Sequence, residues 1–176
     1  TNDSSKCSHL LLNGGKLCIP ESFHEEFINK YVEALENNEE VYLVEKLSRE
    51  IKLFIDIDSK SSTTIDVDKL VLNINAVLPI KNYVYKCNKT NGYHIVYSDR
   101  IVDPEEASEI VKALQHKLVN KYAYELKEIQ NIIDTSVYKT GLRMIGSYKV
   151  ADFRCYLPIN TKNRKYINYN DVFNSL

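Results

Sequence analysis

The chain has 176 residues, of which 44% are hydrophobic, and its formal net charge is −1. This length can bury a core as one domain, or as two small lobes that share a cleft. The near-neutral charge excludes a generally basic nucleic-acid binder of the histone kind, so any binding of phosphate must be local. No apolar run approaches the roughly 20 residues that span a bilayer, and the start TNDSSK lacks signal-peptide character.

The cysteines are widely scattered, at Cys7, Cys18, Cys87 and Cys155, and they form no CxxC pair. This pattern is typical of reduced thiols in an intracellular protein rather than of a disulfide framework, so we expect all four to be free. Cys7 and His9 form a short C-x-H, but no second pair stands at zinc spacing. A zinc site is therefore not expected.

The first fifty residues predict a small α/β unit. A strand or hairpin is expected over 9–19, interrupted at Gly14-Gly15, followed by a helix that Ser22 caps and Asn37-Asn38 ends. A strand is expected over 41–44. The apolar residues of the helix recur at helical spacing: Phe23, Phe27, Tyr31 and Leu35.

A strand over 50–58 is predicted next, because its side chains alternate between an apolar face and a face that ends in Asp56 and Asp58. A helix over 66–78, a strand over 82–86, a turn at Asn91-Gly92 and a strand over 93–98 follow.

A long helix then begins at Asp103, which is placed to cap it, with Pro104 in the first turn and Glu106 completing a capping box. We expect further extended segments over 142–147 and 153–157. Residues 50–147 thus have the order β-α-β-β-α-β. This order predicts an α+β ferredoxin-like or RNA-recognition-like unit.

The expected organisation is one domain in three parts: an N-terminal α/β subdomain over 1–49, the RNA-recognition-like subdomain over 50–157, and a C-terminal tail over 158–176. The tail mixes cations with aromatic residues that could contact single-stranded template, although a solvated tail is the simpler interpretation. These residues are Lys162, Arg164, Lys165, Tyr166 and Tyr169.

The ferredoxin-like order predicts which segments meet. Its first and third strands are antiparallel neighbours, so we expect Asp58 to lie near His94. The fourth strand flanks the first on its other side, which brings the segment 134–143 to the same edge. Three motifs that are separate in the chain should therefore converge.

The first motif is Asp56-Ile57-Asp58 at the end of a strand. Two carboxylates at i and i+2 point the same way, and a divalent cation between them relieves their repulsion. Mg²⁺ and Mn²⁺ prefer such oxygen ligands. The alternative is a pair of solvated acids.

The second motif surrounds His94. Gly92 could let the backbone approach a phosphate, and His94 could donate a hydrogen bond to a triphosphate oxygen. The alternative is a structural histidine on a strand.

The third motif begins at Asp134 and continues through Arg143 to Lys149. Asp134 could be a third carboxylate ligand for two metal ions, and the two cations could contact a nucleoside triphosphate or the template backbone. The alternative for each residue taken singly is that Asp134 is a turn residue and that Arg143 and Lys149 are surface charges.

Taken in order, the segments FIDID, GYHIVYSD and DTSVYKTGLRMIGSYK resemble the archaeo-eukaryotic primase superfamily, which is a family with an acidic pair on a strand, a histidine on a strand and a later aspartate followed by a basic segment. GGKLCIP and the YLVEK that precedes FIDID are similar to primase domains fused to helicases in large DNA viruses of the poxvirus, asfarvirus and mimivirus kind.

The resemblance implies a nucleotidyltransferase that makes primers on single-stranded DNA from nucleoside triphosphates, with Mg²⁺ or Mn²⁺ as cofactor. It implies a helicase domain in the same polypeptide, and a location in the host cytoplasm or nucleus. It makes Asp56, Asp58 and Asp134 the metal ligands, and it makes His94 a contact to nucleotide phosphates, with Arg143 and Lys149 as basic positions. Gly92 stands where many relatives carry serine. In this family the active site lies in a cleft between the two subdomains.

Two other functions fit parts of the pattern. An RNA-recognition-like or origin-binding module without catalysis would carry aromatic pairs on its exposed sheet face, where this sequence predicts Asp56, Asp58 and His94. A metal-dependent nuclease would need a paired-histidine motif, which is absent, and a helical tyrosine, for which Tyr122 and Tyr124 are candidates.

Overall fold

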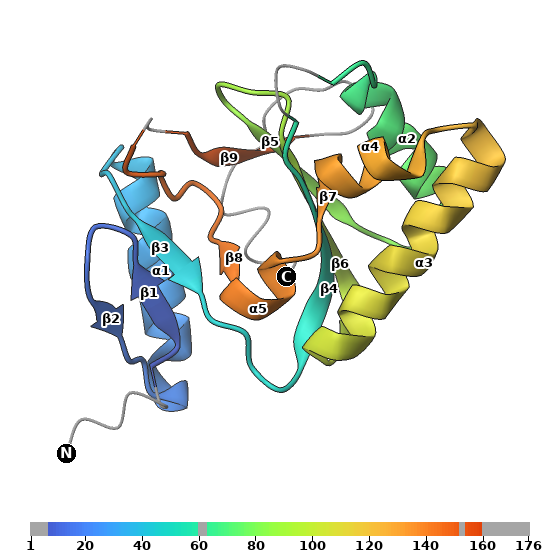
Figure 1. Ribbon diagram of the computed structural model, residues 1–176. Helices are drawn as coiled ribbons and strands as arrows, with labels where there is room; N and C mark the ends of the chain where they lie inside the picture. Colours follow the sequence, from blue (N-terminus) through green and yellow to red (C-terminus); the bar gives the residue numbers. More distant parts are fainter. Residues whose placement is uncertain (1–6, 60–62, 152–153, 160–176) are drawn as a thin grey trace.

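The computed structural model describes residues 7–59, 63–151 and 154–159, and these form two antiparallel sheets and five α-helices (Figure 1). The architecture is α+β, as expected. Within the described residues, no helix is both long and apolar enough to cross a membrane.

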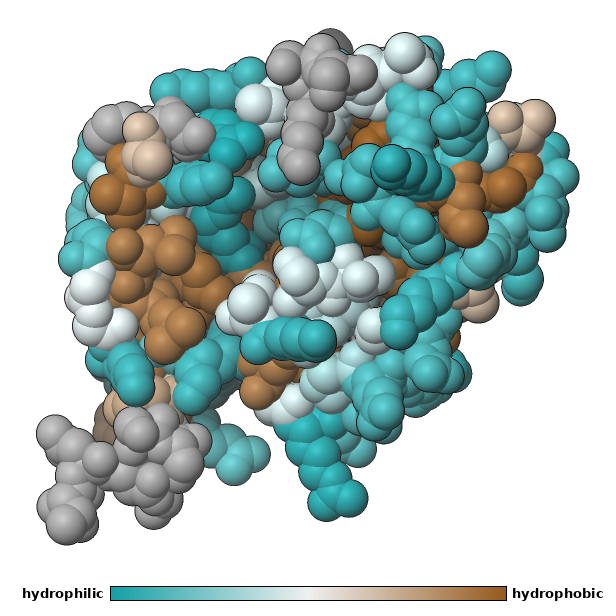
Figure 2. All heavy atoms as spheres, in the orientation of Figure 1, coloured by the Kyte–Doolittle hydropathy of each residue, from teal (hydrophilic) through white to brown (hydrophobic). Residues whose placement is uncertain are grey.

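The first sheet has the strand order β2-β1-β3-β8. Its strands are β1 (His9–Leu11), β2 (Lys16–Leu17), β3 (Leu43–Glu45) and β8 (Leu142–Arg143). The predicted hairpin is confirmed, and Gly14 and Gly15 at its turn have φ of 110° and 113°, a region that favours glycine. Figure 2 shows hydrophobic residues gathered on one face over this part of the molecule.

One helix packs on this sheet. A short 3-10 helix, η2 (Glu21–Phe23), leads into α1 (His24–Glu36), so the helix begins after Ser22 and no side chain caps it. Tyr31 and Leu35 of α1 form a small buried cluster with Leu43 of β3. Asn37 and Asn38 end the helix as predicted, with Asn38 at a φ of 59°.

The hairpin also corrects the expectation of four reduced thiols. Cys7 and Cys18 form a disulfide with a Cα–Cα distance of 3.9 Å, because the pairing of His9 with Leu17 brings the flanking residues of β1 and β2 together. The sequence spacing alone did not show this pairing. Cys87 and Cys155 are free and buried.

The second sheet has the order β7-β4-β6-β5-β9, and its neighbouring strands are antiparallel. The expected neighbours of the ferredoxin-like order are confirmed, since β4 lies between β6 and β7. Its strands are β4 (Ile51–Ile57), β5 (Tyr83–Cys87), β6 (Tyr93–Val102), β7 (Ile133–Asp134) and β9 (Tyr156–Ile159).

Helices pack on one face of the second sheet (Figure 1). Asp66 caps α2 by accepting from the N–H of Lys69, and Asp103 caps α3 by accepting from the N–H groups of Glu105 and Glu106. The helices that follow β4 are α2 (Val67–Val77), α3 (Pro104–Tyr122), α4 (Leu126–Ile132) and α5 (Val137–Thr140).

The alternation predicted for the strand over 50–58 decides which face is covered. Ile55 and Ile57 of β4 are buried in a core with Leu70 of α2, Ile95 of β6 and Leu118 of α3. Full burial of each such side chain contributes about 1.5–3 kcal/mol. The other face of β4 is therefore left to Phe54, Asp56 and Asp58.

The position of the fourth strand was predicted wrongly. The structure places β7 at Ile133–Asp134, whereas the predicted segment 142–147 contributes β8, which pairs with β3 of the first sheet. Strand β7 has two residues and directly follows α4, so it is too short to show alternation in the sequence. The extended segment expected over 153–157 overlaps β9, beside β5.

Candidate functional site

Three polar residues from distant parts of the chain form one row across the second sheet. Asp56 on β4 is the register partner of Asp134 on β7 and of His94 on β6. Register partners project from the same face of a sheet, and Asp58 shares that face because it lies two residues after Asp56. The predicted convergence of the three motifs is confirmed at the level of strand register.

His94 contacts Asp56, its register partner, and Asp58 lies two residues farther along the chain. The His94 Nε2 atom lies 3.4 Å from Asp56 Oδ1, and the two side chains are 3% and 14% exposed. Asp56 Oδ1 is buried and accepts no hydrogen bond from the residues that the structure describes. A buried carboxylate oxygen without a donor is costly, and a bound cation would compensate for it.

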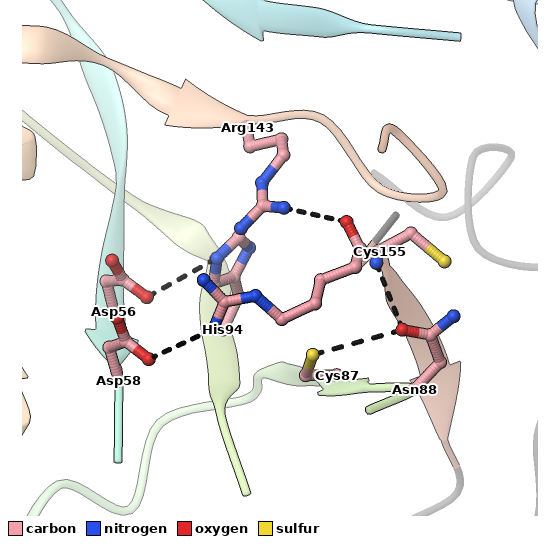
Figure 3. Close-up of polar contacts among 8 residues, drawn as sticks. Asp56, Asp58, Cys87, Asn88, His94, Arg143 and Cys155 are labelled. Atoms are coloured by element: carbon pink, nitrogen blue, oxygen red, sulfur yellow. Dashed lines mark hydrogen bonds and ion pairs between the residues drawn. The ribbon is translucent and has the colours of Figure 1, made fainter. Parts of the chain in front are cut away.

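Asp58 lies at the open end of the row. Its side chain is 48% exposed, and Arg154 Nη1 lies 3.8 Å from its Oδ1 (Figure 3). Its backbone N–H donates to the carbonyl of Ile132, which joins the end of β4 to the end of α4. This carboxylate is therefore accessible, and it pairs with Arg154, a cation from the segment before β9.

The carboxylate of Asp134 is turned toward the start of α5. Asp134 Oδ1 accepts from the Ser136 N–H at 2.7 Å, and Oδ2 accepts from Ser136 Oγ at 3.0 Å. Across the described ranges, no group of three or more His, Cys, Asp or Glu side chains is arranged to hold a metal ion. Strand register brings Asp134 beside Asp56, but this side-chain conformation does not close a three-carboxylate cluster.

Gly92 is buried beside the row. A Cβ atom at this position would lie 2.9 Å from Tyr156 Oη and 3.2 Å from the carbonyl oxygen of Ile57. Close packing against Tyr156 thus accounts for the absence of a side chain at this position.

Sequence reasoning missed Tyr156 as a site residue. Its ring stacks on the His94 imidazole, with 3.5 Å between centroids and 23° between planes. Burial raises the pKa of the Tyr156 hydroxyl, so the phenol stays neutral. The extended segment over 153–157 was the available signal, but the sequence does not show that this segment lies beside β5 with Tyr156 against His94.

The two predicted cations differ in position. Arg143 Nη1 donates to the carbonyl of Arg154 at 2.8 Å, and its guanidinium carbon lies 5.0 Å from the centre of the Tyr156 ring. Figure 3 shows Arg143 extending from β8 toward the region of His94 and Asp56. Lys149 is exposed, and its backbone N–H donates to the carbonyl of Arg154.

A cavity of about 640 Å³ lies between the two sheets. His94, Phe54 and Tyr85 line it from the second sheet, and Arg143 and His9 line it from the first. The pKa of His9 is lowered by burial and by the neighbouring His24. The hydroxyl of Tyr85 is buried and has no hydrogen-bond partner within the described part of the chain.

The tyrosines considered for a nuclease lie elsewhere, at the carboxyl end of α3. Tyr122 and Tyr124 have ring centroids 6.3 Å apart, and Tyr124 Oη accepts from Asn73 Nδ2 at 2.7 Å. Tyr124 is thus engaged in an internal contact with α2.

Residues 8–160 match the family described as the C962R protein N-terminal AEP domain. AEP denotes archaeo-eukaryotic primase. No curated protein matches the chain. The matched range contains all three motifs and both sheets. The chain therefore belongs to the family of C962R-type N-terminal AEP domains, which are archaeo-eukaryotic primase domains of primase-helicases from large DNA viruses.

Proposed function

We propose that this domain is a DNA-dependent primase that synthesises short primers on single-stranded DNA from nucleoside triphosphates during viral DNA replication. Membership of the AEP family implies a nucleotidyltransferase of the primase type. The observation that carries the proposal is the row of Asp134, Asp56 and His94 across three strands. On one face of the sheet, the row places two carboxylates that suit a divalent cation beside an imidazole that can donate to a phosphate oxygen.

The proposed metal ligands are Asp56, Asp58 and Asp134. The buried Oδ1 of Asp56, which accepts no hydrogen bond within the described part of the chain, and the oxygen-only donor set suit a hard divalent cation such as Mg²⁺ or Mn²⁺. When bound, a pair of such ions lowers the pKa of the attacking 3′-hydroxyl and neutralises charge on the leaving pyrophosphate. Asp134 would exchange its contact with Ser136 for this role.

His94 and Arg143 are the proposed contacts to the triphosphate. His94 Nε2 lies 3.4 Å from Asp56 Oδ1, so the Asp56 carboxylate holds the imidazole at the site. The guanidinium of Arg143 lines the same cavity and can donate two hydrogen bonds to phosphate oxygens. The backbone of Gly92 and the exposed Lys149 are proposed as further contacts to the nucleotide.

We propose that the active site adjoins the cavity between the sheets, which His94 and Arg143 line, with the part over 1–49 on one side and the part over 50–157 on the other. Strand β8 belongs to the first sheet although it lies in the second range, so Arg143 would reach the site from the opposite wall. We further propose a helicase domain in the same polypeptide, and a location in the host cytoplasm or nucleus. The basic and aromatic tail residues from 162 to 169 lie outside the described residues.

A primer-synthesis assay tests this function. Single-stranded DNA, nucleoside triphosphates and Mn²⁺ or Mg²⁺ are supplied to the natural chain and to the Asp56→Ala, Asp58→Ala double variant. Loss of extended product in the double variant is expected. Asp99→Ala, which removes an exposed carboxylate of β6 outside the row, is the matched control and should retain activity. Equal product from the natural chain and the double variant would overturn the proposal.

A further inference from the structure

We propose that Tyr156 is a positioning residue that fixes both proposed triphosphate contacts, His94 and Arg143, in the orientation needed to bind a nucleotide. This inference rests on the proposed function and names the device that organises its phosphate site. Tyr156 is 3% exposed and contacts both His94 and Arg143, so its proposed effect passes through these two neighbours.

The contact with His94 is a parallel stack. A centroid distance of 3.5 Å with planes inclined by 23° leaves the imidazole little freedom to rotate about its Cβ–Cγ bond. The Asp56 carboxylate then holds the Nε2 edge at 3.4 Å. Stacking on Tyr156 and the contact with Asp56 together restrict the imidazole, and aromatic pairs contribute about 0.5–1.5 kcal/mol beyond their buried area.

The contact with Arg143 is a cation–π arrangement. The guanidinium carbon lies 5.0 Å from the Tyr156 ring centre, within the range of such attraction. The carbonyl of Arg154 accepts from Arg143 Nη1 at 2.8 Å, and Arg154 lies two residues before Tyr156 in the chain. The segment 154–156 therefore orients Arg143 in two ways, through the backbone carbonyl of Arg154 and through the ring of Tyr156.

The surroundings of Tyr156 are shaped to admit its ring. Its register partner on β5 is the small residue Cys87, and Gly92 leaves space for its hydroxyl. The side chain of Asn88 fixes the segment, because Asn88 Oδ1 accepts from the N–H of Cys155 at 3.1 Å (Figure 3). These two small residues and the contact with Asn88 set the Tyr156 ring against His94, which lies on β6, two strands away from β9.

Steady-state primer synthesis on single-stranded DNA, with Mn²⁺ present, separates positioning from a general effect on folding. Tyr156→Leu is expected to raise the KM for the nucleoside triphosphate and the inhibition constant of pyrophosphate by about 2- to 10-fold, which corresponds to the strength of one aromatic pair. The dissociation constant for template DNA should change little. Tyr156→Phe keeps the ring and should retain values within about twofold of the natural chain.

The control is Tyr83→Leu, which removes an aromatic ring packed on the same small cluster as Tyr156. It should leave KM and pyrophosphate inhibition unchanged after correction for the folded fraction. In a His94→Ala background, Tyr156→Leu should add less to the KM than it does alone, because part of its effect passes through the imidazole.

Equal KM values for Tyr156→Leu and the natural chain, or equal losses for Tyr156→Leu and Tyr156→Phe, would overturn the role of the ring. If the effects of Tyr156→Leu and His94→Ala on the free energy derived from KM add in full, the proposed coupling between Tyr156 and the imidazole is wrong. If the natural chain itself makes no primers, the proposed function fails first, and this outcome is distinct from an active chain that is insensitive to position 156.

Discussion

Asp56 and Asp134 are register partners on β4 and β7, although α2, β5, β6, α3 and α4 separate them in the chain. Two carboxylates on neighbouring strands repel each other when both are ionised, and a shared cation removes this cost. The arrangement thus ties divalent-ion binding to the stability of the second sheet.

We therefore expect Mn²⁺ to stabilise the natural chain against thermal unfolding. At a concentration 100-fold above the dissociation constant, binding contributes about 2.7 kcal/mol, which corresponds to a rise in Tm of roughly 5–10 °C for a chain of this size. Asp56→Asn should lose most of this rise, whereas Asp99→Asn should keep it. Calorimetry with and without Mn²⁺ measures both, and a rise in Asp56→Asn as large as in the natural chain would contradict the assignment.

Arg143→Lys tests whether the guanidinium shape matters. Lysine keeps the positive charge, but it lacks the forked guanidinium that donates to the Arg154 carbonyl while its central carbon lies 5.0 Å from the centre of the Tyr156 ring. We expect a rise in the KM for nucleoside triphosphate of about 10-fold, of the size that loss of a charge-assisted hydrogen bond gives. Arg100→Lys, at an exposed ion pair with Glu106, is the control. No change in KM would show that charge alone suffices at position 143.

Gly92→Ala should disturb the site through Tyr156. The new methyl group would lie 2.9 Å from Tyr156 Oη, so either the ring or the turn must shift. We expect a loss of about 1–3 kcal/mol in the free energy of unfolding, the usual cost of overpacking. Adding Tyr156→Phe removes the clashing hydroxyl and should recover part of the loss. Denaturant unfolding of the two single variants and the double variant measures the recovery, and strict additivity would exclude this clash as the cause.

His9 should make stability depend on pH. Burial lowers its pKa below the ordinary value of 6.5, so the unfolded chain takes up a proton first as the pH falls. Folding with a neutral, buried His9 has its full free energy of unfolding above pH 6.5. This free energy decreases as the pH falls through the lowered pKa of His9. Its register partner Glu45 has a pKa raised above the ordinary value of a glutamate, mainly because the carboxyl group is buried.

We expect His9→Gln to flatten the decline in Tm below pH 6.5 relative to the natural chain. The comparison between the two proteins removes most of the common contribution of Glu45. His116→Gln, at an exposed position on α3, should leave the decline unchanged. Parallel Tm profiles for His9→Gln and the natural chain would contradict the assigned shift.

The sequence alone determined the elements with strong periodicity or strong caps. The alternation along β4 predicted both its buried face and the acidic face that carries Asp56 and Asp58, and Asp103 with Pro104 predicted the start of α3. The order of these elements also predicted that β4 would lie between β6 and the fourth strand. Local patterns suffice here because burial of alternate residues and helix capping are short-range effects.

Only the tertiary structure decided contacts that depend on strand register and on pairing between distant segments. A slip of one residue would place His94 opposite Ile57 or Ile55 instead of Asp56, and nothing in either strand alone fixes that register. Strands β7 and β8 have two residues each, which is too short for a pattern that predicts the neighbouring strand. The predicted position of the fourth strand was therefore wrong. The disulfide between Cys7 and Cys18 and the stack of Tyr156 on His94 arise in the same way, because long-range packing brings together residues that carry no mutual signal in the chain.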